Sequence, residues 1–210
     1  MRLGLFGGSF DPVHFGHLLL AESCREQQRL DRVLFLPAAT PPHKQGFERT
    51  SGVRRAEMLE LAVGGHEPFG VSRFEIDRGG VSYTVETLRH FRQEAPEAEL
   101  FFLMGADMLY DLPHWREAAV ICQLATPIVV RRAGVAEPDF DILAEIASPE
   151  RRQQIRAHQV EMPAIGLSST EIRQRVASGR SIRYWTTPAV EQYILQHALY
   201  RAPPKEAPES

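Results

Sequence analysis

The sequence contains little cysteine and no long apolar run. Its 210 residues include two cysteines, Cys24 and Cys122, which are too few for the disulfide framework of a secreted protein. No apolar segment approaches the ~20 residues that span a bilayer. The start of the chain, Met1–Phe6, leads directly into two glycines and lacks the basic region, apolar core and cleavage site of a signal peptide. We therefore expect a cytoplasmic protein with no membrane partner.

The sequence also lacks an excess of positive charge. Its 24 Lys and Arg residues are outnumbered by 27 Asp and Glu residues, which gives a net charge of −3. A broad nucleic-acid-binding face needs the opposite balance, so nucleic acid is not an expected partner. The length and the absence of a linker predict a single domain over residues 1–200, followed by a disordered Pro-rich tail over 201–210. A homo-oligomer is left open.

Three common motifs of nucleotide and ester chemistry are missing. The chain has no G-x-x-x-x-G-K-[ST], which excludes a Walker-type nucleotide triphosphatase, and no G-x-G-x-x-G to indicate a dinucleotide-binding dehydrogenase. No segment completes the G-x-S-x-G turn that presents a hydrolase serine. Any phosphate chemistry must therefore use another arrangement.

Short apolar runs alternate with amphipathic segments along the chain. The runs are too short for buried helices and are bounded by Gly, Pro or charged residues, so we expect strands. These runs are Leu3–Phe6, Val33–Pro37, Phe69–Val71, Leu100–Gly105 and Pro127–Val130. Between them, apolar residues recur at helical spacing; the clearest sets are Leu18, Ala21 and Cys24; Val85, Leu88 and Phe91; and Val190, Tyr193, Ile194 and His197. The alternation predicts an α/β fold with a doubly wound, mostly parallel sheet and helices on both faces.

The loops that follow three of these strands are the expected site of chemistry. Sheets of this class bind ligands beyond the carboxyl ends of the strands, at the point where strand order reverses. This rule selects the loops after Phe6, Pro37 and Gly105. By contrast, Gly134–Glu161 is mostly polar and weakly periodic, and we expect a surface insertion there.

The first of these loops has the residue types of a phosphate site. Two adjacent glycines permit a sharp turn, Asp11 is suited to a helix N-cap, and Pro12 is suited to a first helical position. The N-terminus of a helix favours phosphate through its free N–H groups and its dipole. His14 and His17 are three residues apart, which places them on one helix face. Two alternatives stay open: an ordinary strand–turn–helix unit, and a zinc site that would need a third ligand such as Cys24.

Two segments of the chain resemble known signatures. The segment D-P-V-H-F-G-H at residues 11–17 resembles the (H/T)-x-G-H signature of the nucleotidylyltransferase superfamily, and G-L-S-S-T-E-I-R at residues 166–173 resembles its I-S-S-T-x-I-R signature. Further segments resemble the bacterial nicotinate mononucleotide adenylyltransferase family from Met1 to about Tyr200. These are P-P-H-K at 41–44, G-V-S-Y-T at 80–84, G-A-D at 105–107, P-H-W-R at 113–116, and the ending around Tyr193-Ile194 and Leu199-Tyr200.

The resemblance implies a fold, a reaction and a set of site residues. The fold is a Rossmann-like nucleotidylyltransferase fold, and the reaction joins ATP and nicotinate mononucleotide to give nicotinate adenine dinucleotide and pyrophosphate. Mg²⁺ is the implied cofactor, held mainly through phosphate oxygens with no dedicated protein ligand. The implied catalytic residues are His14, His17, Ser169 and Arg173. ATP would contact Gly8, Ser9, Phe10, His17, Gly105, Asp107, Ser168, Ser169, Thr170 and Arg173. Nicotinate mononucleotide would contact Gly8, Ser9, Lys44, Tyr83, Thr84, Trp115 and Arg132.

Each of these residues also has an ordinary structural explanation. Taken alone, Ser169 and Asp107 fit helix caps, Trp115 fits a packing residue, and Lys44 fits a solvated loop charge. Arg131-Arg132 replaces the R-P-G often found in the family at that place, so the choice of Arg132 over Arg131 is open. Two other functions compete with the one above: a sister enzyme such as a pantetheine-phosphate adenylyltransferase or a cytidylyltransferase, and a non-catalytic nucleotide-binding protein.

Overall fold

A six-stranded sheet forms the centre of the computed structural model, which describes residues 1–41 and 50–201. The strands are β1 (Arg2–Gly8), β2 (Arg32–Pro37), β3 (Phe69–Val71), β4 (Glu99–Gly105), β5 (Thr126–Arg132) and β6 (Gln159–Met162). They lie in the order β3-β2-β1-β4-β5-β6, and every neighbouring pair is parallel. The five predicted strands are confirmed, and the sixth was missed. Strand order reverses between β1 and β4, which is where this class of sheet binds ligands.

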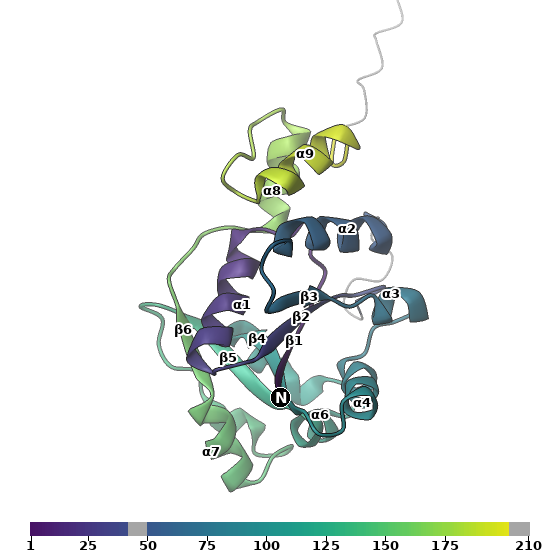
Figure 1. The fold of residues 1–210 in the computed structure, drawn as a ribbon. Coiled ribbons are helices and arrows are strands. Elements are labelled where there is room, and N and C mark those ends of the chain that lie inside the picture. Colours follow the sequence, from purple (N-terminus) through teal and green to yellow (C-terminus); the bar gives the residue numbers. More distant parts are fainter. Residues whose placement is uncertain (42–49, 202–210) are drawn as a thin grey trace, which may run out of the picture.

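Helices cover both faces of the sheet (Figure 1). Their bounds are α1 (Phe15–Gln27), α2 (Gly52–Val63), α3 (Phe74–Arg78), α4 (Thr84–Glu94), α5 (Ala106–Leu109), α6 (Ala118–Leu124), α7 (Pro149–Ala157), α8 (Ser169–Ala177) and α9 (Pro188–Gln196). One buried cluster joins α1, α2, α8 and α9 to one face, and a second joins α4, α5, α6 and α7 to the other. Successive residues of β4 alternate between these clusters, as the two-residue period of a strand requires. The predicted doubly wound α/β class is therefore confirmed.

Most residues of the helical patterns predicted from sequence face the core, but His197 is exposed and caps the end of α9. Val85, Leu88 and Phe91 are buried on α4, and Ala21 and Cys24 are buried on α1. A helix that buries one stripe against a sheet gains most of its stability from that stripe. Within the part of the chain that the structure describes, no helix is both long and apolar enough to cross a membrane.

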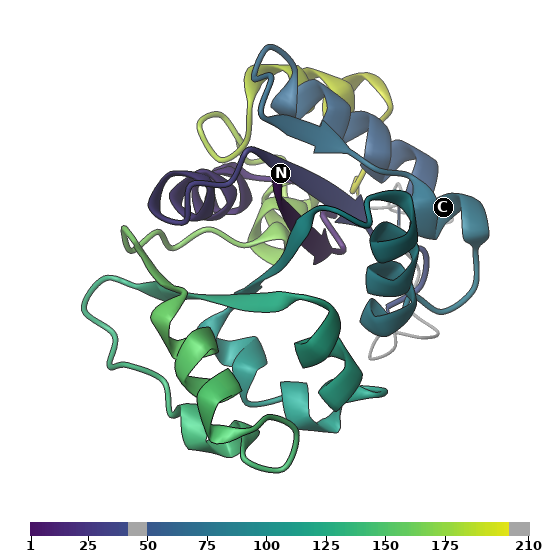
Figure 2. The ribbon, with the colours of Figure 1, turned by 60° about the horizontal axis from the view of Figure 1, so that its bottom comes forward.

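The expected surface insertion at Gly134–Glu161 is wrong. This segment contains α7 and β6, and its residues Leu143 and Ile155 are completely buried. β6 pairs with β5 and buries Val160, and Figure 2 shows the green segment of α7 and β6 against this half of the sheet. The pattern was missed because α7 buries a single residue, and because β6 is a four-residue edge strand with polar residues at alternate positions.

A helix opens within a few residues of Asp11 and Pro12, as predicted, but neither residue is its N-cap or its first residue. α1 begins at Phe15, and its N-cap is His14 in an extended conformation, with φ −147°. Asp11 and Pro12 lie in the turn that precedes the cap. The local preference of an Asp-Pro pair to open a helix is overridden because side chains from the far end of the sequence bind this turn, as described below.

Candidate active site

The loop that follows β1 is held in place through its backbone carbonyl groups. Four of these carbonyls accept hydrogen bonds from side chains of distant segments. The pairs are Arg55 Nη1 to Ser9 at 2.7 Å, Arg173 Nη1 to Asp11 at 2.7 Å, Ser169 Oγ to Pro12 at 2.8 Å, and Thr186 Oγ1 to Val13 at 2.8 Å. Oxygen atoms that would repel a phosphate are therefore bound to the protein. An anion can approach the loop through N–H groups instead.

The hydrogen bonding of His17 fixes its tautomer. The backbone N–H of His14 donates to Nδ1 of His17 over 3.3 Å, and the two imidazole rings stack with centroids 3.7 Å apart and planes 23° apart. A neutral imidazole carries one proton. Because Nδ1 accepts a bond here, that proton is on Nε2. The Nε2–H group is the donor that His17 can offer to a phosphate oxygen.

Both histidines are neutral at pH 7. Burial lowers the pKa of His14 from 6.5 to about 4. Burial is also the main reason that the pKa of His17 lies well below 6.5, and the charge of a protonated His14 would lower it further. No carboxylate contributes to either pKa shift, so no nearby negative charge favours the protonated form of either ring. The pair therefore offers N–H donors rather than two positive charges.

Small and aromatic residues around the histidines set their positions. A Cβ atom at Gly16 would lie 3.0 Å from Nδ1 and Cε1 of His14, so a side chain there would displace the ring. The Phe10 side chain is 1% exposed and meets the His17 ring edge-on, with centroids 5.0 Å apart. Phe10 was predicted to contact ATP, but its ring supports His17 from the core.

The second signature lies against the first. Ser168, rather than Ser169, caps α8, because its Oγ accepts from the backbone N–H of Glu171 at 3.1 Å. Ser169 and Arg173 contact the β1 loop, and Arg173 Nη2 also donates to Thr170 Oγ1 at 3.2 Å. The structural alternative for Ser169, that it is the helix cap, is therefore wrong. Residues that are more than 150 positions apart in sequence share one side of the molecule.

The residues predicted for the pyridine ring lie at the start of α4 and beside it. Tyr83 is the N-cap of α4, and Thr84 is its first residue. The Arg116 guanidinium lies over the Tyr83 ring, 4.6 Å from its centroid, which brings the adjacent Trp115 to the same region. Trp115 packs edge-on against Phe102, and its buried Nε1 has no hydrogen-bond partner within the described residues. A ligand acceptor would satisfy that donor.

Two further predicted residues end strands at the same edge of the sheet. β4 ends at Gly105, which is the N-cap of α5, and Asp107 is exposed in the first turn of that helix. Asp107 is therefore not the cap that its alternative explanation required. Arg132 ends β5 and is exposed, whereas Arg131 forms an ion pair with Glu161 and donates to the Val135 carbonyl at 3.1 Å. Arg132 is thus the more available of the two. Lys44, also predicted for the substrate, lies outside the described residues.

Comparisons with known proteins identify the family. A family model described as cytidylyltransferase-like matches residues 5–175. A protein of Thermomicrobium roseum named a probable nicotinate-nucleotide adenylyltransferase is 46% identical over 200 residues, which are 95% of this chain and 92% of the relative. A protein of the same name from Thermus thermophilus is 46% identical over 96% of this chain and 100% of the relative. This chain belongs to the nicotinate-nucleotide adenylyltransferase family.

A solved structure supports the fold of this adenylyltransferase family member. The Plasmodium falciparum nicotinic acid mononucleotide adenylyltransferase, described as complexed with NaAD, has a TM-score of 0.75 and covers 95% of this chain and 97% of its own. Its sequence identity is 17%, so the likeness concerns the fold. The predicted Rossmann-like architecture is therefore confirmed.

The donor groups of this adenylyltransferase site fit phosphate oxygens better than a directly bound metal ion. Within residues 1–41 and 50–201, no group of three or more His, Cys, Asp or Glu side chains could hold a metal ion. Cys24, the third ligand of the zinc alternative, is buried in the core, and burial raises the pKa of its thiol. The neutral His17 Nε2–H and the N–H groups of α8 fit phosphate oxygens.

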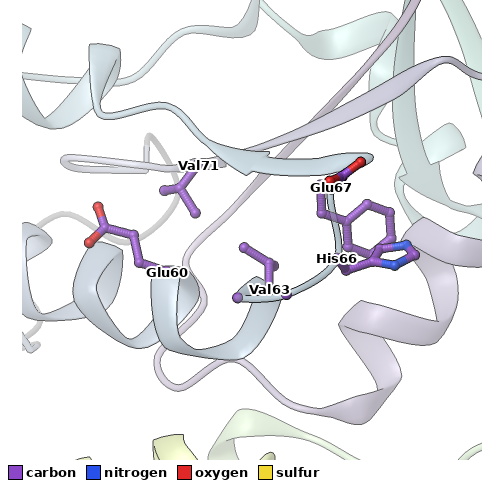
Figure 3. Close-up of a pocket in the computed structure, with 8 residues that line it drawn as sticks. Glu60, Val63, His66, Glu67 and Val71 are labelled. Carbon is purple, nitrogen blue, oxygen red and sulfur yellow. The ribbon is translucent and has the colours of Figure 1, made fainter.

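A cavity of about 430 Å³ lies apart from the adenylyltransferase site. It is lined by the end of α2, the following turn and β3. Figure 3 shows Val63 and Val71 between Glu60 on one side and His66 and Glu67 on the other. Two carboxylates at its walls would repel a polyphosphate, and none of the predicted site residues lines it.

Sequence reasoning missed Arg55, a buried side chain that holds two loops of the site together through their carbonyl groups. It is 1% exposed and donates to the carbonyls of Ser9, Ala38 at 2.6 Å and Thr50 at 3.0 Å. It thereby joins the loop after β1 to the loop after β2. A signal was present in the sequence: Arg55 occupies the same helical stripe as Met58 and Leu59, both of which are buried. An arginine on an apolar stripe indicates a buried donor with several acceptors.

Proposed function

We propose that this protein transfers the adenylyl group of ATP to nicotinate mononucleotide, giving nicotinate adenine dinucleotide and pyrophosphate. The observation that carries the proposal is the contact of the two signature segments: Arg173 and Ser169 bind the carbonyls of the loop that presents the neutral donor His17. A triphosphate placed between the β1 loop and the N-terminus of α8 would meet N–H donors from both sides. The sequences of the adenylyltransferase relatives support the choice of reaction.

The reaction needs no nucleophilic side chain. A phosphate oxygen of the mononucleotide attacks the α-phosphorus of ATP, a new P–O bond forms, and the bond to the β-phosphate oxygen breaks to release pyrophosphate. The attacking oxygen is already an anion, so a general base is unnecessary. The protein must hold two anions together and stabilise charge as it moves onto pyrophosphate. Bound Mg²⁺ supplies additional positive charge at the phosphate oxygens.

The proposed roles follow from the donors on each element. His17 Nε2–H would bind the transferred phosphate, and the His14 ring stacked upon it would fix its orientation. The N–H groups at Ser168–Thr170 would hold the β- and γ-phosphates. Arg173 would add a cationic donor to the leaving pyrophosphate while it keeps its bond to the Asp11 carbonyl.

The pyridine and ribose sites are proposed on separate elements. Thr84 and the backbone at Tyr83 would bind the nicotinate carboxylate at the start of α4, and Trp115 would stack on the pyridinium ring, a cation–π contact of roughly 0.5–2 kcal/mol. Asp107 would accept hydrogen bonds from the ATP ribose, and Arg132 would contact the mononucleotide. Gly8, Ser9 and Lys44 complete the proposed mononucleotide site. A carboxylate pocket of this kind disfavours nicotinamide, because its NH₂ group would be mispaired.

We also propose that the enzyme acts in the cytoplasm. Both cysteines are free and buried, as in proteins of a reducing compartment. Their thiol pKa values are raised by burial, to about 11 for Cys122, so neither is a reactive thiolate at pH 7.

An assay of pyrophosphate release tests the function. Purified protein is incubated with ATP and Mg²⁺ together with nicotinate mononucleotide, its amide analogue or phosphopantetheine. We expect turnover with the acid and weaker turnover with the amide. Turnover with phosphopantetheine alone would select the sister enzyme, and binding of ATP without any turnover would select the non-catalytic protein.

A further inference from the structure

The last aromatic residue of the described chain reaches back to the β1 loop. Tyr200 follows α9, and its hydroxyl donates to Oδ1 of Asp11 over 2.6 Å, across 189 positions of sequence. Asp11 is 6% exposed. A buried carboxylate needs a strong donor, because an unpartnered buried charge is costly. The Tyr200 hydroxyl is such a donor.

Asp11 is bound at both of its ends. Its carboxylate accepts from Tyr200 and its backbone carbonyl accepts from Arg173. The next carbonyl, that of Pro12, accepts from Ser169. The orientation of Asp11 therefore determines how the loop enters the turn that leads to His14 and His17.

The Tyr200 hydroxyl keeps its proton over the physiological range. Burial is the largest reason that its pKa is raised, followed by the negative charge of Asp11 and the hydrogen bond to it. The bond is thus a neutral donor facing an anion, and such bonds are shorter and stronger than bonds between neutral groups.

We propose that Tyr200 is a positioning residue for ATP: through Asp11, it holds the phosphate-binding loop in the conformation that receives the triphosphate. This proposal rests on the proposed adenylyl transfer. Without the hydroxyl, the Asp11 carboxylate loses its donor and turns out of its pocket, toward solvent or toward the phosphates. In either case the carbonyls of the loop shift, and in the second case a negative charge also moves closer to the ligand. ATP binding weakens, whereas the pyridine site at α4 is untouched.

A second tyrosine of the same segment provides a matched control. Tyr193 on α9 donates its hydroxyl to Glu57 of α2. Tyr193→Phe removes a tyrosine–carboxylate bond of the same kind, from the same end of the chain, but Glu57 lies on α2 and outside the loop. Loss of stability alone would affect both variants, whereas loss of loop position would affect only Tyr200→Phe.

The experiment compares steady-state kinetics of wild type, Tyr200→Phe and Tyr193→Phe, at a temperature where circular dichroism shows all three folded. We expect kcat/KM for ATP to fall about tenfold in Tyr200→Phe, as for loss of a hydrogen bond to a charged group, with KM for nicotinate mononucleotide within twofold. Tyr193→Phe should keep kcat/KM for ATP within twofold. An unchanged kcat/KM in Tyr200→Phe, or an equal loss in Tyr193→Phe, overturns the proposal.

Asp11→Ala tests whether Tyr200 acts through this carboxylate. In the Asp11→Ala background, Tyr200→Phe should change kcat/KM for ATP less than twofold; a second full tenfold loss overturns the proposal. Calorimetric binding of a non-hydrolysable ATP analogue to wild type and Tyr200→Phe gives the same comparison without turnover. If wild type binds the analogue but makes no dinucleotide, the proposed function fails, and the positioning role of Tyr200 is still decided by the affinity difference.

Discussion

At the scale of single residues, the site depends on two imidazoles that stay neutral. Their stacking and the bond from the His14 N–H to His17 Nδ1 fix one tautomer. Burial lowers both pKa values. A neutral donor of fixed orientation needs no reorganisation as charge moves between phosphate oxygens, which is the property that makes such donors effective in phosphoryl transfer.

Two substitutions of His17 separate its two nitrogens. Asn can keep an acceptor near the position of Nδ1 and loses the donor at Nε2, whereas Gln can place an amide N–H near Nε2. We expect His17→Asn to lower kcat by about 10²–10³, the effect of losing one preorganised donor, and His17→Gln to retain more activity. Pyrophosphate release at saturating substrates measures both. A kcat close to wild type in His17→Asn would remove His17 from its proposed role.

His14 makes the stability of the protein depend on pH in a defined range. Its folded pKa of about 4 lies below the unfolded value of 6.5, so between these values the unfolded chain binds a proton that the folded chain does not. Stability is therefore lost as pH falls from 6.5 toward 4, by about 3 kcal/mol for this group. We expect His14→Asn to show a smaller loss over that range. Urea unfolding of both proteins at pH 7, 6, 5 and 4 gives the difference, and parallel curves would contradict it.

At the scale of elements, sequence patterns succeeded where a stripe or run was continuous. β3 was predicted at its observed bounds, and the three apolar residues that α4 buries were all predicted. The first signature segment was also placed correctly, in the loop that follows the first strand. One failure came where long-range contacts overrode local preference. Asp11 and Pro12 do not open a helix because Tyr200, Arg173 and Ser169 bind them, and no local pattern contains that information.

The missed elements α7 and β6 can be tested as parts of the core. Ile155 is completely buried on α7, whereas Val135, in the same polar segment, is 52% exposed. We expect Ile155→Ala to lower the free energy of unfolding by about 2–5 kcal/mol, and Val135→Ala to change it by less than about 0.5 kcal/mol. Chemical denaturation of both variants provides the measurement. A surface insertion would instead give two small effects.

At the scale of the whole molecule, segments from the start and the end of the sequence contact each other at the site. The strand order places the β1 loop beside the end of β4, and the chain then returns through β6 to α8, which contacts the same loop. α9 packs on α2 through Glu57 and Tyr193 and carries Tyr200 back to Asp11. C-terminal side chains thus bind the β1 loop near the N-terminus. A nucleotide bound at this loop should therefore stabilise the whole fold.

Arg173 is the residue with which to test that coupling. Its guanidinium reaches the Asp11 carbonyl and Thr170 Oγ1 together, and a lysine at this position cannot reproduce both bonds. At an ATP concentration one hundred times the wild-type Kd, binding should stabilise the wild type by about 2.7 kcal/mol. If Arg173→Lys raises the Kd tenfold, that stabilisation falls to about 1.4 kcal/mol. Arg175→Lys is the control, because Arg175 on the same helix contacts Ser181 and Trp185 and not the loop. Thermal unfolding with and without Mg-ATP gives the comparison: equal stabilisation of wild type and both variants would show that ATP does not bridge the β1 loop and α8.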